Sequence, residues 1–121
     1  MKRKVLAIDD SRTMRGMLSA ALTAAGFDVD LAEDGIEGLE ALDRSRPDLV
    51  ITDINMPRLD GFGLIEGARQ RENCAGLPIL VLSTESGESM KQRARQAGAT
   101  GWIVKPFDEE KLVQVINRLI A

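Results

Sequence analysis

Histidine is absent from this 121-residue sequence. Histidine is the commonest general base in enzymes and a frequent metal ligand, so sites built on that side chain are excluded. A Ser-His-Asp catalytic triad within the chain is excluded for the same reason. Carboxylates are therefore the expected carriers of any chemistry.

Cysteine is also scarce, since Cys74 is the only one. One cysteine allows neither an internal disulfide nor a thiolate metal cluster. No apolar stretch reaches the roughly 18 residues of a membrane-spanning helix. The basic residues Lys2 to Lys4 precede an apolar run that ends at Asp9, which is too short for a secretory signal. We therefore expect a cytoplasmic protein that does not enter a membrane.

The charge and composition predict one globular domain over residues 1–121. The net charge of −3 lacks the basic excess that is typical of nucleic-acid-binding proteins, so no nucleic-acid partner is expected. Hydrophobic residues make up 44% of the chain and charged residues 29%, as in ordinary globular domains. A chain of this length can bury its own core.

Strand and helix signals alternate along the chain without a linker. Strands are expected at Lys4–Ile8, Phe27–Leu31, Asp48–Asp53, Ile79–Leu82 and Thr100–Val104. Helices are expected at Arg12–Ala25, Gly35–Leu42, Phe62–Arg71, Gly87–Ala97 and Asp108–Ile120. The helical spacing places the methionines in the core, namely Met14, Met17 and Met90. This alternation predicts an α/β domain with a parallel sheet and right-handed crossovers.

Polar side chains stand where four of these strands end. In chain order they are Asp9, Asp10, Asp53, Ser83, Thr84 and Lys105. The carboxyl ends of neighbouring parallel strands share one edge of the sheet, where ligands bind. Carboxylates, hydroxyls and an ammonium gathered there predict a divalent metal site beside a phosphorylatable aspartate.

Asp53 is the expected nucleophile because it ends the predicted central strand directly before a turn. Phosphoryl transfer to a carboxylate needs a nucleophilic oxygen, a cation on the phosphoryl oxygens and donors for the remaining charge. The alternative is that Asp53 only caps a turn or a helix. Met56 and Pro57 already supply the turn, which favours the nucleophile.

Asp9 and Asp10 are adjacent carboxylates that repel each other unless a cation neutralises them. Hard oxygen ligands of this kind suit Mg²⁺. The alternative is that Asp10 caps the helix that begins near Ser11. Lys105 is the expected fixed cation, with Asp53 as its partner and the phosphoryl oxygens after transfer. The alternative for Lys105 is a solvent-exposed position at a strand end.

Five segments together carry a resemblance that runs through the chain: Asp9–Asp10, Asp53–Gly61, Leu77–Thr84, Ala97–Ala99 and Lys105–Phe107. Each is weak evidence alone, but their order and their places at strand ends are specific. They resemble the receiver domain of two-component response regulators, and most closely the stand-alone chemotaxis regulators of the CheY type. The resemblance implies a flavodoxin-like, doubly wound (βα)5 domain with strand order 2-1-3-4-5.

The resemblance also implies roles at the metal site. Asp10 and Asp53 would bind Mg²⁺ directly, and Asn55 would add its backbone carbonyl. Asp9 would act mainly through water. The peptide between Lys105 and Pro106 would be cis.

Further implied roles concern a switch between two surface states. Ser83 lies 30 residues after Asp53, where the family has a switch hydroxyl, and the adjacent Thr84 is the other candidate donor. Trp102 occupies the switch aromatic position, although core filling or a surface anchor would also account for it. The helix that contains Lys91, Arg93 and Arg95, together with Trp102 and the last strand, is the implied output surface, although a solvated helix face would also account for these basic residues.

The implied function is that of a signalling protein rather than an enzyme with a separate substrate. A CheA-like histidine kinase would donate the phosphoryl group to Asp53, and a phosphatase would help to remove it. The partner of the switched state would be an output protein such as a flagellar motor switch protein. We expect a monomer without an output domain. A phosphate sink or a phosphorelay shuttle remains the alternative.

Two other classes fit the residues less well. A phosphatase of the haloacid-dehalogenase type needs an acid two residues after its nucleophile, and Asn55 stands there. A degenerate receiver that binds partners without phosphorylation would lack an acid or the lysine. All of these residues are present.

Overall fold

The computed structural model describes residues 2–120. Five parallel strands form one sheet in the order β2-β1-β3-β4-β5, which confirms the expected fold. The strands are β1 (Lys4–Ile8), β2 (Asp28–Ala32), β3 (Leu49–Thr52), β4 (Ile79–Ser83) and β5 (Gly101–Val104). The helices are α1 (Arg12–Ala24), α2 (Gly35–Ser45), α3 (Gly61–Arg69), α4 (Glu88–Ala97) and α5 (Glu109–Ile120), with a 3₁₀ turn at Glu72–Cys74.

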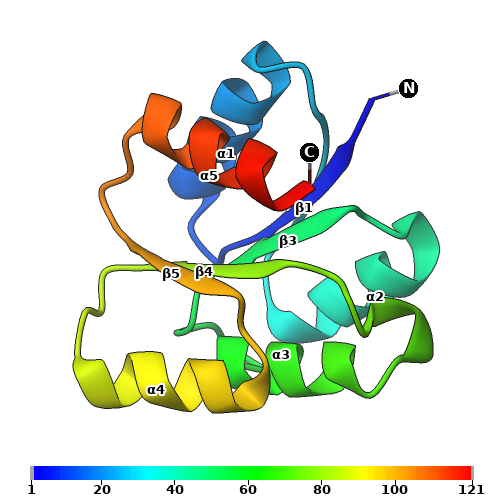
Figure 1. Ribbon diagram of the computed structural model, residues 1–121, viewed down its shortest axis with the longest axis vertical. Helices are drawn as coiled ribbons and strands as arrows, with labels where there is room; N and C mark the ends of the chain where they lie inside the picture. The colour runs from blue at the N-terminus through cyan, green and yellow to red at the C-terminus, as the bar shows by residue number, and fades with distance from the viewer. Residues whose placement is uncertain (1, 121) are drawn as a thin grey trace.

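Helices cover both faces of the sheet, with α1 and α5 on one face and α2, α3 and α4 on the other (Figure 1). Side chains along β1 alternate between the two cores that result. Val5 and Ala7 belong to the core on the side of α1 and α5. Leu6 and Ile8 belong to the core on the opposite side. Because both faces are buried, β1 is a continuous apolar run rather than an alternating one.

The start of α1 shows whether Asp10 caps this helix. Ser11 caps α1, since its Oγ accepts a hydrogen bond from the backbone N–H of Met14 at 3.2 Å. The interpretation of Asp10 as the cap is therefore wrong. The Asp10 side chain is exposed instead, one residue beyond the buried Asp9.

The helix ends and one core prediction differ from expectation. Helix α2 runs three residues past Leu42, and the hydroxyl of Ser45 donates to the carbonyl of Ala41 at 2.9 Å. Met17 is 48% exposed, so its prediction as a core residue was wrong, because the buried stripe of α1 passes through Leu18 instead. Within residues 2–120, no helix is both long enough and apolar enough to cross a bilayer.

An ion pair between Asp43 and Arg71 links α2 to the segment after α3. The guanidinium donates from Nε at 2.6 Å and from Nη2 at 3.0 Å to the two carboxylate oxygens. The hydrogen bond from Arg71 lowers the pKa of Asp43 below its ordinary value. A carboxylate with a lowered pKa stabilises the fold above its unfolded pKa and loses that contribution as pH falls through the folded value.

We therefore expect Asp43→Asn to destabilise the protein slightly at neutral pH, by at most about 1 kcal/mol for so exposed a pair. The difference between wild type and variant should shrink as the pH falls below about 4. Urea unfolding of both proteins at pH 7 and at pH 3 measures this difference in the free energy of unfolding. A difference of equal size at both pH values would show that the ion pair is not its source.

Candidate metal and phosphoryl-acceptor site

Asp9 and Asp53 directly follow the neighbouring strands β1 and β3. Sheet hydrogen bonding continues through both residues, since Asp53 N–H donates to the carbonyl of Ile8 at 2.9 Å and Asp9 N–H donates to the carbonyl of Ala32 at 3.0 Å. The backbones of the two aspartates are therefore fixed by the sheet itself. Asp10 follows on the loop toward α1.

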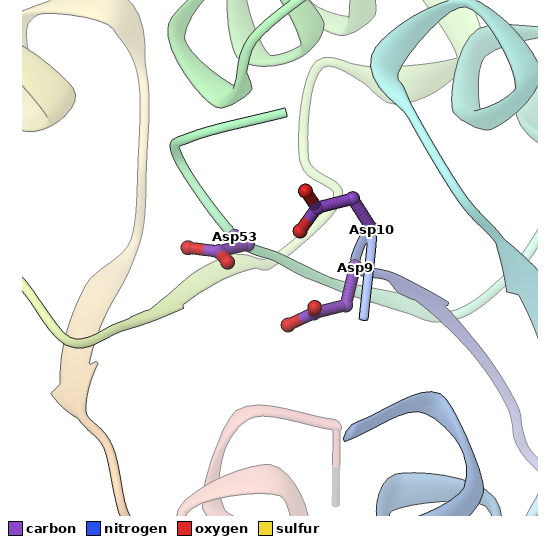
Figure 2. Close-up of side chains that lie close together, drawn as sticks. All are labelled: Asp9, Asp10 and Asp53. Carbon is purple, nitrogen blue, oxygen red and sulfur yellow. The ribbon is translucent and has the colours of Figure 1, made fainter. Parts of the chain in front are cut away.

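The three carboxylates converge at this edge of the sheet (Figure 2). One oxygen from each of Asp9, Asp10 and Asp53 lies within 4.8 Å of the other two. Asp9 is 1% exposed and Asp53 9%, whereas Asp10 is exposed. Hard oxygen donors with one solvent-facing side fit Mg²⁺, which binds few protein ligands and keeps several waters. Asn55, the other candidate ligand, is exposed two residues after Asp53.

Lys105 forms a bridge between two of these carboxylates. Its Nζ donates to Asp9 Oδ2 at 2.7 Å and to Asp53 Oδ2 at 3.0 Å. Only 10% of the lysine side chain is exposed, so the interpretation of Lys105 as a solvent-exposed lysine is wrong. The bond to Asp9 was missed in the sequence, where Asp53 alone was expected as the partner. The peptide between Lys105 and Pro106 is cis, as the resemblance implied.

Two opposing effects act on the pKa of Lys105. Burial lowers the pKa of the ammonium, but the hydrogen bonds to Asp9 and Asp53 outweigh it, and the pKa rises above its ordinary value. Lys105 is therefore charged at neutral pH. The repulsion expected among the carboxylates is relieved in part by this ammonium.

The second oxygen of each buried carboxylate is held by the backbone. Asp9 Oδ1 accepts from Ser11 N–H at 2.9 Å, and Asp53 Oδ1 accepts from Ile54 N–H at 2.7 Å. Asp53 does not cap α3, because Asp60 does so through the N–H of Gly63. With one oxygen on the backbone and one on Lys105, each of the two carboxylates has a fixed orientation.

The two candidate hydroxyls lie in different environments. Ser83, the last residue of β4, is fully buried, and its Oγ accepts from Glu85 N–H at 3.2 Å. Thr84 is exposed. The indole Nε1–H of Trp102 on β5 donates to the carbonyl of Glu85 at 2.9 Å. The backbone of Glu85 thus contacts the side chains of both Ser83 and Trp102, and nothing in the sequence indicated this role.

Comparisons with known proteins agree with this geometry. The family model for the response regulator receiver domain matches residues 5–117. The response regulator MprA of Mycobacterium leprae is 42% identical over 118 residues, which are 97% of this chain and 50% of that protein. This chain therefore spans about half the length of MprA.

Two solved structures extend the comparison. The chemotaxis protein CheY4 of Vibrio cholerae is 41% identical, with a TM-score of 0.94 over 98% of this chain and 99% of that one. The receiver domain of a sensor histidine kinase from Pseudomonas aeruginosa PAO1 is 28% identical, with a TM-score of 0.92 over 99% of this chain and 98% of that one. A magnesium ion is coordinated in the active site cleft of the Pseudomonas domain.

The family match begins in β1 and ends in α5, so it contains every strand end that contributes to the site. The strand order and the acidic edge of the sheet are those that the resemblance implied. This chain belongs to the response regulator receiver domain family of two-component signalling proteins.

Proposed function

We propose that Asp53 accepts a phosphoryl group from a phosphohistidine of a partner histidine kinase, in a reaction that requires Mg²⁺. The observation that carries the proposal is the Lys105 bridge, which joins Asp53 to Asp9 beside the exposed Asp10. A nucleophilic carboxylate, a fixed ammonium and additional carboxylates for a metal are the parts that phosphoryl transfer needs.

In this mechanism a carboxylate oxygen of Asp53 attacks phosphorus while the bond from phosphorus to the histidine nitrogen breaks. The leaving imidazole keeps the electron pair of that bond and takes up a proton. Lys105 donates to a phosphoryl oxygen from the position where it now contacts Asp53. Asp9, Asp10, Asp53 and the backbone carbonyl of Asn55 would hold Mg²⁺, which supplies positive charge to the phosphoryl oxygens when bound. Water later hydrolyses the acyl phosphate, and the protein is reset.

Ser83 and Trp102 are proposed to report the phosphorylated state. When the Ser83 hydroxyl donates to a phosphoryl oxygen, the loop that begins at Thr84 is expected to move with it. That movement reaches Trp102 because Glu85 contacts both side chains. A ligand shifts the equilibrium between two positions of this loop only if it binds one of them more tightly.

We therefore expect beryllofluoride, which mimics the aspartyl phosphate, to change the fluorescence of Trp102 clearly, whereas Mg²⁺ alone changes it little. Emission of this single tryptophan is read during titration of the wild type and of Ser83→Ala. The Ser83→Ala protein should lose most of the response, while Thr84→Ala retains it. An unchanged wild-type spectrum, with binding established by calorimetry, would exclude Trp102 as a switch.

The output of the switch is proposed to be protein binding in chemotaxis, with a flagellar motor switch protein as the target. The support is the likeness to the chemotaxis protein CheY4 over nearly the whole of both chains. The proposed surface comprises α4 and β5, where Lys91, Arg95 and Trp102 line a hollow of about 210 Å³. Affinity capture with and without beryllofluoride tests it. Equal capture of the target with and without beryllofluoride would contradict the switch, and no capture in either condition would favour the phosphate-sink role.

A further inference from the structure

Arg58 lies in an unusual backbone conformation on the loop that follows Asp53. Its φ of +68° places it in the left-handed region, which residues other than glycine adopt infrequently. The loop joins β3 to α3 and also carries Asn55. Residues other than glycine keep a positive φ only when the surrounding contacts impose it, and they concentrate near functional sites.

The contact that accompanies this conformation is a bidentate ion pair with Asp34. Arg58 donates from Nε to Asp34 Oδ2 at 2.8 Å and from Nη2 to Asp34 Oδ1 at 3.1 Å. Asp34 is itself fixed, because it is buried and caps α2 through the N–H of Glu37 at 2.9 Å. The hydrogen bond from Arg58 also lowers the pKa of Asp34 below its ordinary value.

A backbone contact at the next residue reinforces the ion pair. Gly35 N–H donates to the carbonyl of Leu59 at 3.0 Å. A Cβ at Gly35 would clash with that carbonyl, so the loop approaches the start of α2 as closely as a glycine allows. At its other side the loop is closed by Gly61 N–H, which donates to the carbonyl of Ile54 at 2.8 Å.

We propose that Asp34 and Arg58 are positioning residues for the phosphoryl-acceptor site. Their ion pair holds the loop against α2, and through the loop it sets the Asn55 carbonyl relative to the carboxylate of Asp53. Neither residue touches Mg²⁺ or the phosphoryl group; both act through the backbone between Asp53 and Gly61. The inference rests on the proposed function, because it assigns these residues to the same metal and phosphoryl site.

Two variants remove the ion pair in different ways. Asp34→Asn keeps an oxygen that can cap α2 but removes the charge. Arg58→Asn removes the guanidinium but keeps a residue type that tolerates a positive φ. Asp43→Asn is the matched control, because it breaks the bidentate pair with Arg71, which has the same form but lies outside the acidic cluster.

The affinity for Mg²⁺ is measured by calorimetry without any phosphodonor, and the melting temperature is measured in the same buffer. We expect the Kd for Mg²⁺ to rise about tenfold in Asp34→Asn and in Arg58→Asn, as for other residues that orient metal ligands. Asp43→Asn should bind Mg²⁺ with wild-type affinity even where its melting temperature falls. Arg58→Lys, which keeps the positive charge but loses the bidentate geometry, should give a Kd for Mg²⁺ between those of the wild type and Arg58→Asn.

Wild-type Mg²⁺ affinity in both Asp34→Asn and Arg58→Asn would overturn the proposal. A loss of affinity in Asp43→Asn equal to theirs would also overturn it, because the effect would then follow stability rather than the loop. The proposed function is judged separately, by treating wild-type protein with phosphoramidate and Mg²⁺. Protein that binds Mg²⁺ but gains no phosphoryl group would contradict that function and leave the comparison of Mg²⁺ affinities intact.

Discussion

Asp53→Asn is expected to abolish phosphoryl uptake, with a fall in rate of at least about a thousandfold, as for the loss of other nucleophiles. The amide keeps an oxygen that can accept from Ile54 N–H, so the loop should retain its structure. It lacks the charge that makes the carboxylate a nucleophile and that pairs with Lys105. The measurement is the intact mass after incubation with phosphoramidate and Mg²⁺, or label transferred from a phosphorylated histidine kinase.

Asp10→Ala is the informative companion, because it removes a candidate metal ligand while leaving Asp53 in place. Its phosphorylation should be slower at low Mg²⁺ and should recover as the Mg²⁺ concentration rises. Asp53→Asn should not recover at any Mg²⁺ concentration. Labelling of Asp53→Asn at the wild-type level would show that another residue is the acceptor.

Lys105→Ala is expected to separate phosphoryl uptake from its consequences. Asp53 and the candidate metal ligands remain, so uptake should stay measurable, with a rate lowered by about a hundredfold, the lower end of the range for a single lost electrostatic donor. The response of Trp102 to beryllofluoride and the binding of a partner should be largely lost. The ammonium is the donor expected to tie the phosphoryl group to the end of β5, the strand that carries Trp102.

The same variant should also be less stable without Mg²⁺. It leaves Asp9, which is 1% exposed, without its cationic partner. Removing one partner of a buried pair costs about 3–5 kcal/mol, and Mg²⁺ should restore part of it. Lys111→Ala, which removes an exposed ammonium on α5, is the control. Lys105→Ala protein that is labelled, responds to beryllofluoride and binds its partner as the wild type does would show that the lysine is only structural.

The bounds of β1 were predicted residue for residue, because a continuous apolar run that follows Lys4, ends at Ile8 and stops at adjacent carboxylates is typical of a strand buried on both faces. The convergence of Asp9 and Asp53 was predictable for a related reason. Parallel strands that are neighbours must end at one edge, whatever their separation in the chain. The strand order itself came from the family resemblance rather than from the pattern.

The contacts that were missed depend on tertiary distances or on the backbone. Lys105 and Asp9 are 96 positions apart in the sequence. Because Asp9 and Asp53 lie at the same edge of the sheet, the order of the strand ends could not show that the lysine contacts both carboxylates rather than one. Arg58 is not a residue type that signals a positive φ, and its pairing with Asp34 exists only once α2 and the loop have met. Glu85 acts through its peptide group, which every residue has.

The Lys105 bridge means that the protein supplies its own counter-ion to Asp53, the proposed acceptor. Three clustered carboxylates and one ammonium leave two negative charges, which is the charge that one divalent cation neutralises. Binding of one Mg²⁺ at this edge would then neutralise the cluster rather than add net charge to it. An incoming phosphoryl group, itself an anion, would meet a pocket close to electroneutrality, and long-range repulsion between two anionic reactants would no longer oppose their encounter.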